Sequence, residues 1–141
     1  MIRPRTDADL DACVAALRQV QAADRYPVHW PDDPRAFLTP AALTGAWIAV
    51  EDGSVLGHVG LAGREVTRLF VTPAARGRGL AVRLLDTVSG AAGPLELEVS
   101  DEGKAAIALY ERAGWRRVGS ERADWRDSTG EPALVHRYVS P

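Results

Sequence analysis

Two arginines and two glycines alternate in the middle of the chain, in the order Arg76, Gly77, Arg78, Gly79. Glycine reaches backbone conformations that are closed to other residues and leaves the neighbouring amides open to a ligand. The arginines add positive charge, and the apolar spacing of the residues that follow predicts a helix whose first N–H groups point into the same turn. Residue types in this order predict a binding site for an anion, with phosphate as the expected ligand.

Two common phosphate-binding motifs do not fit this segment. A P-loop requires Lys followed by Ser or Thr after its last glycine, and Leu80 and Ala81 stand in that place. A dinucleotide fingerprint requires a third glycine, which is missing here. The formal net charge of -2 and the lack of a wider basic run argue against a nucleic-acid site.

The segment from Arg76 to Ala81 instead resembles the pyrophosphate loop of the GNAT superfamily of N-acetyltransferases. That loop has Gln or Arg, two residues, Gly, one residue, and Gly or Ala, and it follows a strand, as this segment follows an apolar run ending Leu-Phe-Val. The resemblance implies that acetyl-CoA is the co-substrate. It places the pyrophosphate on the loop and the pantetheine arm on the main chain of the preceding strand. The implied cofactor-binding residues are Leu69, Phe70, Val71, Arg76, Gly77, Arg78, Gly79, Leu80 and Ala81.

A second segment, Ala106 to Trp115, resembles a later motif of the same family, Ala-x-x-Leu-Tyr on a helix that ends at Gly and an aromatic residue. The resemblance implies that Tyr110 is the general acid that protonates the departing thiolate of CoA. The alternative is a tyrosine whose ring only packs against the sheet. The family often has Asn seven residues before this tyrosine. This chain has Gly103 there, with Ser100 and Lys104 as candidate substitutes.

Acetyl transfer to an amine also needs a proton acceptor, because an alkyl amine is mostly protonated at neutral pH. Glu65 is the first candidate, since the histone-acetyltransferase branch of the family has a catalytic glutamate at the same spacing, eleven residues before the loop arginine. Glu96 and Glu98 share one face of a predicted strand and are the second candidates. Ordinary solvated carboxylates, with water as the acceptor, are the alternative. Family geometry implies that the Val71 N–H binds the oxyanion.

The elements that must position these residues follow the order of the GNAT fold. The resemblance and the pattern together predict an α+β, three-layer fold: a central mixed, mostly antiparallel sheet with helices on both faces and splayed central strands. Strands are expected at residues 2–4, 47–51, 55–61, 65–71, 95–99, 115–122 and 133–139. Helices are expected at 7–21, at 104–113 and from 81 to a break at 90–94, with short helical pieces after Asp33-Pro34 and Thr39-Pro40.

Composition sets the remaining expectations. The 141 residues are expected to form one GNAT acetyltransferase domain, residues 1–141. No apolar run approaches the roughly 18 residues of a membrane span, and the start of the chain lacks the apolar core of a signal peptide, which predicts a cytoplasmic protein with no membrane partner. Cys13 is expected in the core, and three scattered histidines predict no metal site.

The acceptor is expected to be a primary amine on a small molecule or a peptide, and a homodimer is a candidate assembly. The resemblance implies that residues 26–43 and 125–136 select the acceptor. Core packing and helix capping are the alternatives for that first segment. A catalytically inactive acyl-CoA-binding regulator is the rival function. The candidate pocket residues are Tyr26, His29, Trp30 and Phe37, with Asp32 or Asp33 to attract a cationic amine.

Overall fold

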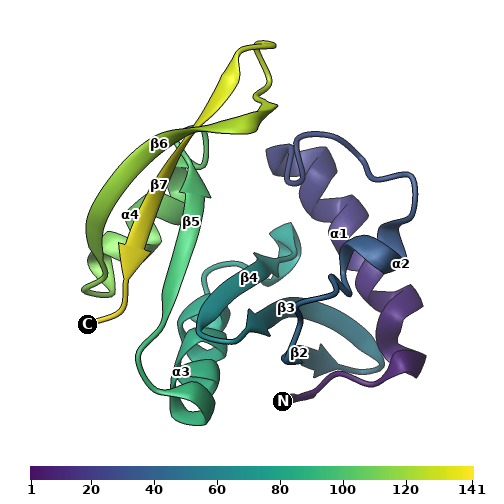
Figure 1. Ribbon diagram of the computed structural model, residues 1–141. Coiled ribbons are helices and arrows are strands. Elements are labelled where there is room, and N and C mark those ends of the chain that lie inside the picture. Colours follow the sequence, from purple (N-terminus) through teal and green to yellow (C-terminus); the bar gives the residue numbers. More distant parts are fainter.

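A seven-stranded sheet runs through the molecule, with its strands in the order β1-β2-β3-β4-β5-β7-β6 (Figure 1). The computed structural model describes residues 1–141. Neighbouring strands are antiparallel except β4 and β5, which are parallel. The sheet is therefore mixed and mostly antiparallel, as expected. The strands are β1 (Ile2–Pro4), β2 (Gly45–Glu51), β3 (Ser54–Ala62), β4 (Glu65–Val71), β5 (Glu96–Ser100), β6 (Arg116–Arg126) and β7 (Pro132–Val139).

Helices cover both faces of this sheet (Figure 1). Because side chains alternate along each strand, each face has its own apolar cluster. Cys13 and Leu17 pack with Phe70 on one face, whereas Leu84 packs with Leu97 on the other. None of the helices is both long and apolar enough to cross a bilayer. The helices are α1 (Leu10–Asp24) and α2 (Pro34–Phe37) on the first face, and α3 (Leu80–Ala92) and α4 (Lys104–Arg112) on the second.

The two parallel strands in the centre of the sheet separate soon after they begin. Their register contains only two pairs, Glu65 with Glu96 and Val66 with Leu97. Beyond these pairs β4 and β5 diverge, so that residues 67–71 and 98–100 border an opening in the sheet (Figure 1). The expected splay of the central strands is confirmed.

Several local predictions are confirmed. Asp52 and Gly53 have φ angles of 51° and 77°, which are those of a type I′ hairpin turn between β2 and β3. The Asp33 side chain accepts a hydrogen bond from the Ala36 amide at 3.1 Å and caps α2. Cys13 is fully buried, and burial raises the pKa of its thiol to about 11.

Two local predictions are wrong. No helix follows Thr39-Pro40. A single turn forms there, closed by the Leu43 amide on the Pro40 carbonyl at 2.9 Å, because β2 begins only two residues after Leu43. The predicted break at residues 90–94 comes late, since α3 continues through Gly90 to Ala92. A glycine inside a helix is unfavourable by only about 1 kcal/mol, which the packing of the flanking turns offsets.

Candidate active site

The Arg76–Ala81 loop joins the end of β4 to the first turn of α3. Gly77 and Gly79 have φ angles of 82° and 72°, in the left-handed region that favours glycine, and Gly79 is the N-cap of α3. None of the amides from Gly77 through Val82 donates a hydrogen bond within the protein. This run of free N–H groups lies at the positive end of a helix and is suited to bind an anion.

The two arginines of the loop pair with carboxylates from other elements. Arg76 makes a two-pronged contact with Asp24 at the end of α1, and it also donates to the Val71 carbonyl at 3.2 Å. Arg78 lies 3.3 Å from Glu51 at the end of β2. All four side chains are about half exposed, so a bound anion can compete for the arginines.

A bulge interrupts β4 just before the end that is not paired with β5. Gly60 lies opposite Thr67 and His58 lies opposite Phe70, so β4 has one more residue than β3 over this interval. Arg68 lies within the bulge. Its φ is 54°, a left-handed conformation that is uncommon for a residue other than glycine. The bulge shifts the register of β4 against β3 where β4 leaves β5, and the regular pairing resumes at Phe70.

The main chain of Val71 faces the opening between β4 and β5. The Thr72 amide donates to the Leu56 carbonyl of β3 at 2.9 Å. Because antiparallel strands point alternate residues toward and away from each neighbour, the N–H and C=O of Val71 point away from β3. The same alternation directs the main chain of Leu69 outward and that of Phe70 back to β3. Leu69 and Val71 are therefore the two residues whose polar main-chain groups point into the opening, where the Val71 carbonyl already accepts a hydrogen bond from Arg76.

Tyr110 lies on α4 with its ring in the core. The ring packs against Trp115 and Tyr138, at centroid distances of 5.8 and 6.2 Å. Its hydroxyl makes no hydrogen bond within the protein. Every side-chain polar atom that is fully shielded from solvent has a hydrogen-bond partner in this protein. Because the Tyr110 hydroxyl has no such partner, it must retain contact with solvent. Burial, with a smaller contribution from the Tyr26 phenol, raises the pKa of Tyr110 above its usual value. The phenol is therefore protonated at neutral pH.

The three candidate proton acceptors, Glu65, Glu96 and Glu98, converge on one side chain. Arg137 of β7 lies 3.9, 3.2 and 2.7 Å from their carboxylates respectively. Among the three, Glu98 lines a hollow of about 230 Å³. That hollow is bordered by β5, β6 and β7, and its other lining residues are Gly119, Ser120, Glu121, Val135 and Arg137.

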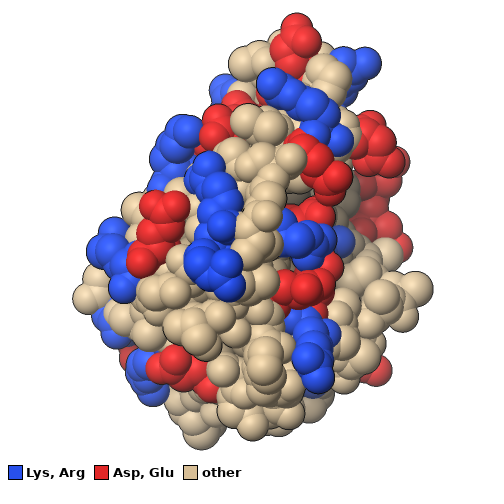
Figure 2. Space-filling view, turned by 60° about the vertical axis from the view of Figure 1, so that its left-hand side comes forward, with Lys and Arg blue, Asp and Glu red and all other residues tan.

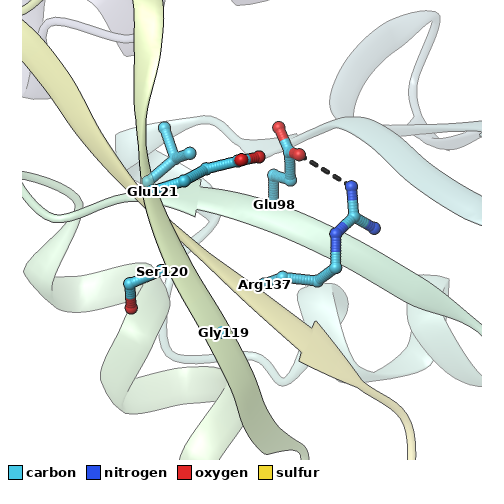
Figure 3. A pocket seen from close by; sticks show the side chains of 6 residues that line it. Glu98, Gly119, Ser120, Glu121 and Arg137 are labelled. Atoms are coloured by element: carbon cyan, nitrogen blue, oxygen red, sulfur yellow. Dashed lines mark hydrogen bonds and ion pairs between the residues drawn. The ribbon is translucent and has the colours of Figure 1, made fainter.

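Glu121 is a second carboxylate in this hollow. Figure 3 shows its side chain directed toward Glu98, whereas Ser120 points the other way along β6. Glu121 takes part in no ion pair, whereas Glu98 is bound to Arg137. Sequence reasoning missed Glu121 and Arg137, because β6 is exposed along nearly its whole length and has no pattern that marks one residue.

The aromatic residues between α1 and α2 do not line this hollow. Three of them pack against the apolar cluster beneath α1, namely Tyr26, Trp30 and Phe37. This arrangement corresponds to core packing, the alternative to an acceptor pocket. His29 contacts the Arg126 carbonyl at 3.1 Å, so this segment touches the β6–β7 hairpin. Asp33 is engaged in capping α2.

Gly103 is the N-cap of α4 and offers no side chain to a ligand. A Cβ at this position would lie 3.2 Å from the Ser100 carbonyl, which is a tight fit. The two proposed substitutes have partners in the protein. The Ser100 hydroxyl accepts from the Glu102 amide at 3.2 Å, and the Lys104 ammonium pairs with Asp101 at 3.3 Å.

The charged side chains on the face drawn in Figure 2 are mixed in sign. Basic and acidic groups lie side by side there, and no continuous basic surface forms. Binding of a nucleic-acid backbone depends on such a surface. This face therefore does not favour a nucleic-acid partner.

Comparison with known proteins identifies the family of the chain. Residues 14–125 match the family model described as acetyltransferase (GNAT) domain. N-alpha-acetyltransferase RimI of Mycobacterium tuberculosis is 33% identical over 144 residues, covering 94% of this chain and 88% of RimI. Peptidyl-lysine N-acetyltransferase YjaB of Escherichia coli is 29% identical over 100 residues, covering 70% of this chain and 66% of YjaB.

Solved structures show the same fold. The ribosomal-protein-S18-alanine N-acetyltransferase of Escherichia coli superimposes with a TM-score of 0.74 at 22% identity, covering all of this chain and 92% of that one. NAA60 of Arabidopsis thaliana, solved with a bisubstrate analogue, gives a TM-score of 0.74 at 17% identity, covering 99% of this chain and 95% of that one. The expected three-layer architecture is thereby confirmed.

Proposed function

Because the chain belongs to the GNAT family and is an acyl-CoA N-acyltransferase, we propose that it transfers an acetyl group from acetyl-CoA to a primary amine by direct attack on the thioester. The free amides from Gly77 through Val82, next to the opening between β4 and β5, carry this proposal. RimI and YjaB are named for α-amino and peptidyl-lysine acetylation. An amine on a peptide is therefore the acceptor class we propose first.

The loop and the edge of β4 would hold the donor. Its pyrophosphate would accept hydrogen bonds from the free amides of the loop, and Arg76 and Arg78 would exchange Asp24 and Glu51 for phosphate oxygens. The pantetheine amides would pair with the outward main chain of Leu69 and Val71. The thioester would then lie in the opening of the sheet.

The acceptor would come from the side of the hollow. Glu98 and Glu121 provide negative charge there, which attracts an ammonium group. Glu98 takes a proton from the ammonium, and the neutral nitrogen attacks the thioester carbonyl carbon. The oxyanion that forms accepts a hydrogen bond from the Val71 N–H. The C–S bond then breaks, and Tyr110 donates its phenolic proton to the thiolate. The second N–H proton lost by the attacking nitrogen passes to the Tyr110 phenolate, which gives the acetylated amine and CoA thiol and restores the phenol.

Glu98 is a better candidate for the base than Glu65. Glu98 lines the hollow and lies one residue beyond the last β4–β5 pair, where the opening begins. Glu65 belongs to the closed end of the same pair of strands and does not line the hollow. Both carboxylates face Arg137, so Glu98→Gln and Glu65→Gln are matched substitutions. We expect kcat to fall about 100-fold in Glu98→Gln and less than threefold in Glu65→Gln. Equal losses in the two variants would contradict this assignment.

Release of free CoA thiol across a panel of amines tests the proposed function. The panel consists of peptides with a free N-terminus, peptides with one lysine and a blocked N-terminus, and small diamines. Turnover of a peptide amine is the expected result. Binding of acetyl-CoA, measured by calorimetry, without turnover of any amine would instead favour the catalytically inactive regulator.

A further inference from the structure

We propose that His58 of β3 is a positioning residue that holds the bulge of β4 and so presents Leu69 and Val71 to acetyl-CoA. This inference rests on the proposed function, because it takes the edge of β4 to be the co-substrate site. His58 belongs to neither motif of the sequence. It stacks on Phe70 of the apolar cluster beneath α1 and does not line the hollow.

Both ring nitrogens of His58 are engaged in the interior. The side chain is fully buried, at 0% exposure. Its Nε2 lies 2.9 Å from a guanidinium nitrogen of Arg5, and its Nδ1 lies 2.8 Å from the carbonyl oxygen of Arg68. A guanidinium only donates, so Nε2 must accept and Nδ1 must carry the proton that it donates to Arg68. The ring also stacks on Phe70, with centroids 5.2 Å apart and planes 9° apart.

The bond from His58 reaches the one residue of β4 that is in the left-handed region. Non-glycine residues in this conformation persist where the surrounding structure holds them. His58 holds the carbonyl of Arg68, and the Arg68 side chain is held on the other side by the Phe37 carbonyl at 2.8 Å and by the Phe37 ring at 4.0 Å. Arg68 is thereby fixed by both its main chain and its side chain.

Arg5 extends this network to the end of α2. Its guanidinium donates to the Leu38 carbonyl at 2.7 Å and to the Thr39 hydroxyl at 3.0 Å, besides contacting His58. The segment that the family resemblance assigns to acceptor selection is thus joined to the bulge through His58. A movement of the end of α2 would therefore be transmitted to the bulge of β4, and a movement of the bulge to α2, through buried hydrogen bonds.

Loss of the Nδ1 donor would act on the register of β4. The Arg68 carbonyl would lack its partner, and a strand without its bulge would pair one residue out of step with β3 from Arg68 onward. Such a shift exchanges the directions of successive residues, so that Phe70, rather than Leu69 and Val71, would direct its main chain into the opening. Acetyl-CoA would then meet the wrong hydrogen-bonding groups.

Two substitutions separate the two bonds of His58. In His58→Asn the side-chain amide can donate from near the Nδ1 position to Arg68, and the bond to Arg5 is lost. In His58→Gln the side-chain oxygen can accept from Arg5 near the Nε2 position, and the donor to Arg68 is lost. We expect the Kd for acetyl-CoA, measured by calorimetry, to rise about tenfold in His58→Gln and less than threefold in His58→Asn. The KM for acetyl-CoA should rise in parallel, with the KM for the amine nearly unchanged.

His136 provides the matched control. It is also buried, at 4% exposure, and its nitrogens lie 2.7 Å from the Ser120 hydroxyl and 2.8 Å from Asp101. It lies on β7, one residue from Arg137 and so on the opposite face of that strand. His136→Gln should lower the unfolding temperature as His58→Gln does and leave the Kd for acetyl-CoA unchanged. A fall in affinity that follows the loss of stability in both variants would overturn the proposal.

A second variant covers the case in which His58→Gln does not fold. Arg68→Gly keeps the carbonyl that His58 binds and removes the side chain held by Phe37, while glycine accepts the φ of 54°. If His58 holds the bulge, the affinity for acetyl-CoA should change less than threefold. A tenfold loss would show that the contacts of the Arg68 side chain with Phe37, and not the bond from His58, hold the bulge, and it would overturn the role of His58. Failure of the wild-type protein to bind acetyl-CoA would overturn the proposed function itself, and this inference with it.

Discussion

Tyr110 combines two properties that rarely occur in one side chain. Its ring contributes to the core at 7% exposure, and its hydroxyl has no hydrogen-bond partner within the protein. Because the hydroxyl keeps contact with solvent, it avoids the penalty of about 1–3 kcal/mol that a buried, unpaired hydroxyl carries. A hydroxyl left free at the edge of the core is available to a ligand. Packing and acid catalysis are therefore compatible roles for this residue.

Tyr110→Phe keeps the ring and removes the proton donor. We expect kcat to fall about 100-fold, the usual scale for loss of a general acid, with the Kd for acetyl-CoA unchanged. The free energy of unfolding should change by less than about 1 kcal/mol, since the hydroxyl has no partner to lose. Steady-state kinetics and chemical denaturation measure the two effects. Unchanged turnover would remove Tyr110 from the mechanism.

His58 should make the stability of the protein depend on pH. Burial lowers the pKa of His58 from its ordinary value of 6.5 to about 4, and the positive charges of Arg5 and Arg68 act in the same direction. The hydrogen bond to the Arg68 carbonyl raises the pKa and offsets only part of this effect. Between these values the unfolded chain binds the proton and the folded chain does not, so stability rises with pH across this window. The free energy of unfolding should fall by up to about 3 kcal/mol as the pH drops from 6.5 to 4. In His58→Asn that pH dependence should be flatter; an identical slope would refute the assignment.

At the scale of elements, the loop of the anion site is tied to α1 through Arg76 and Asp24. Asp24 is the last residue of α1, and the chain turns directly after it at Arg25, whose φ is 57°. The ion pair is half exposed, so its strength is limited to at most about 1 kcal/mol. Phosphate oxygens at the loop would replace the Asp24 carboxylate and release the end of α1.

Asp24→Asn tests this competition. Removal of a negative charge beside an anion site should lower the Kd for acetyl-CoA about two- to fivefold, and the difference from wild type should shrink at high salt. Calorimetry at two salt concentrations measures it. Asp11→Asn, on the first turn of α1 and paired with Arg35, is the control and should leave the Kd unchanged. Weaker binding by Asp24→Asn would show that Asp24 orients Arg76 for the phosphate and does not compete with it.

The elements were predictable from sequence where local chemistry decides them. Glycines at 77 and 79 and the Asp52-Gly53 turn each require backbone angles that few residues accept, and the structure has those angles. The bulge at Arg68 had no such signal, because arginine has no preference for the left-handed region and is held there by His58 from another strand. The meeting of Arg137 with Glu98 likewise depends on strands that lie far apart in the sequence.

At the scale of the whole molecule, two strand assemblies share one sheet. The meander of β1 to β4 and the group of β5, β6 and β7 pair across only two residue positions, and side chains of α3 and α4 pack over the junction. The packing of α3 and α4 on their face of the sheet therefore holds the two assemblies together more than the hydrogen bonds between β4 and β5 do.

The short junction between β4 and β5 leaves the sheet of the free enzyme interrupted, and under the proposed function acetyl-CoA would complete it. The amides of Leu69 and Val71 and those at 77–82 should exchange their hydrogens for deuterium quickly in the free protein, and saturating acetyl-CoA should slow both groups selectively. Mass spectrometry of peptides from these segments would measure this effect. The edge strand β6 serves as a reference segment whose exchange acetyl-CoA should not slow. Equal protection throughout the chain would mean that the ligand only suppresses global opening. Selective protection would make acetyl-CoA, in effect, the missing strand between the two assemblies.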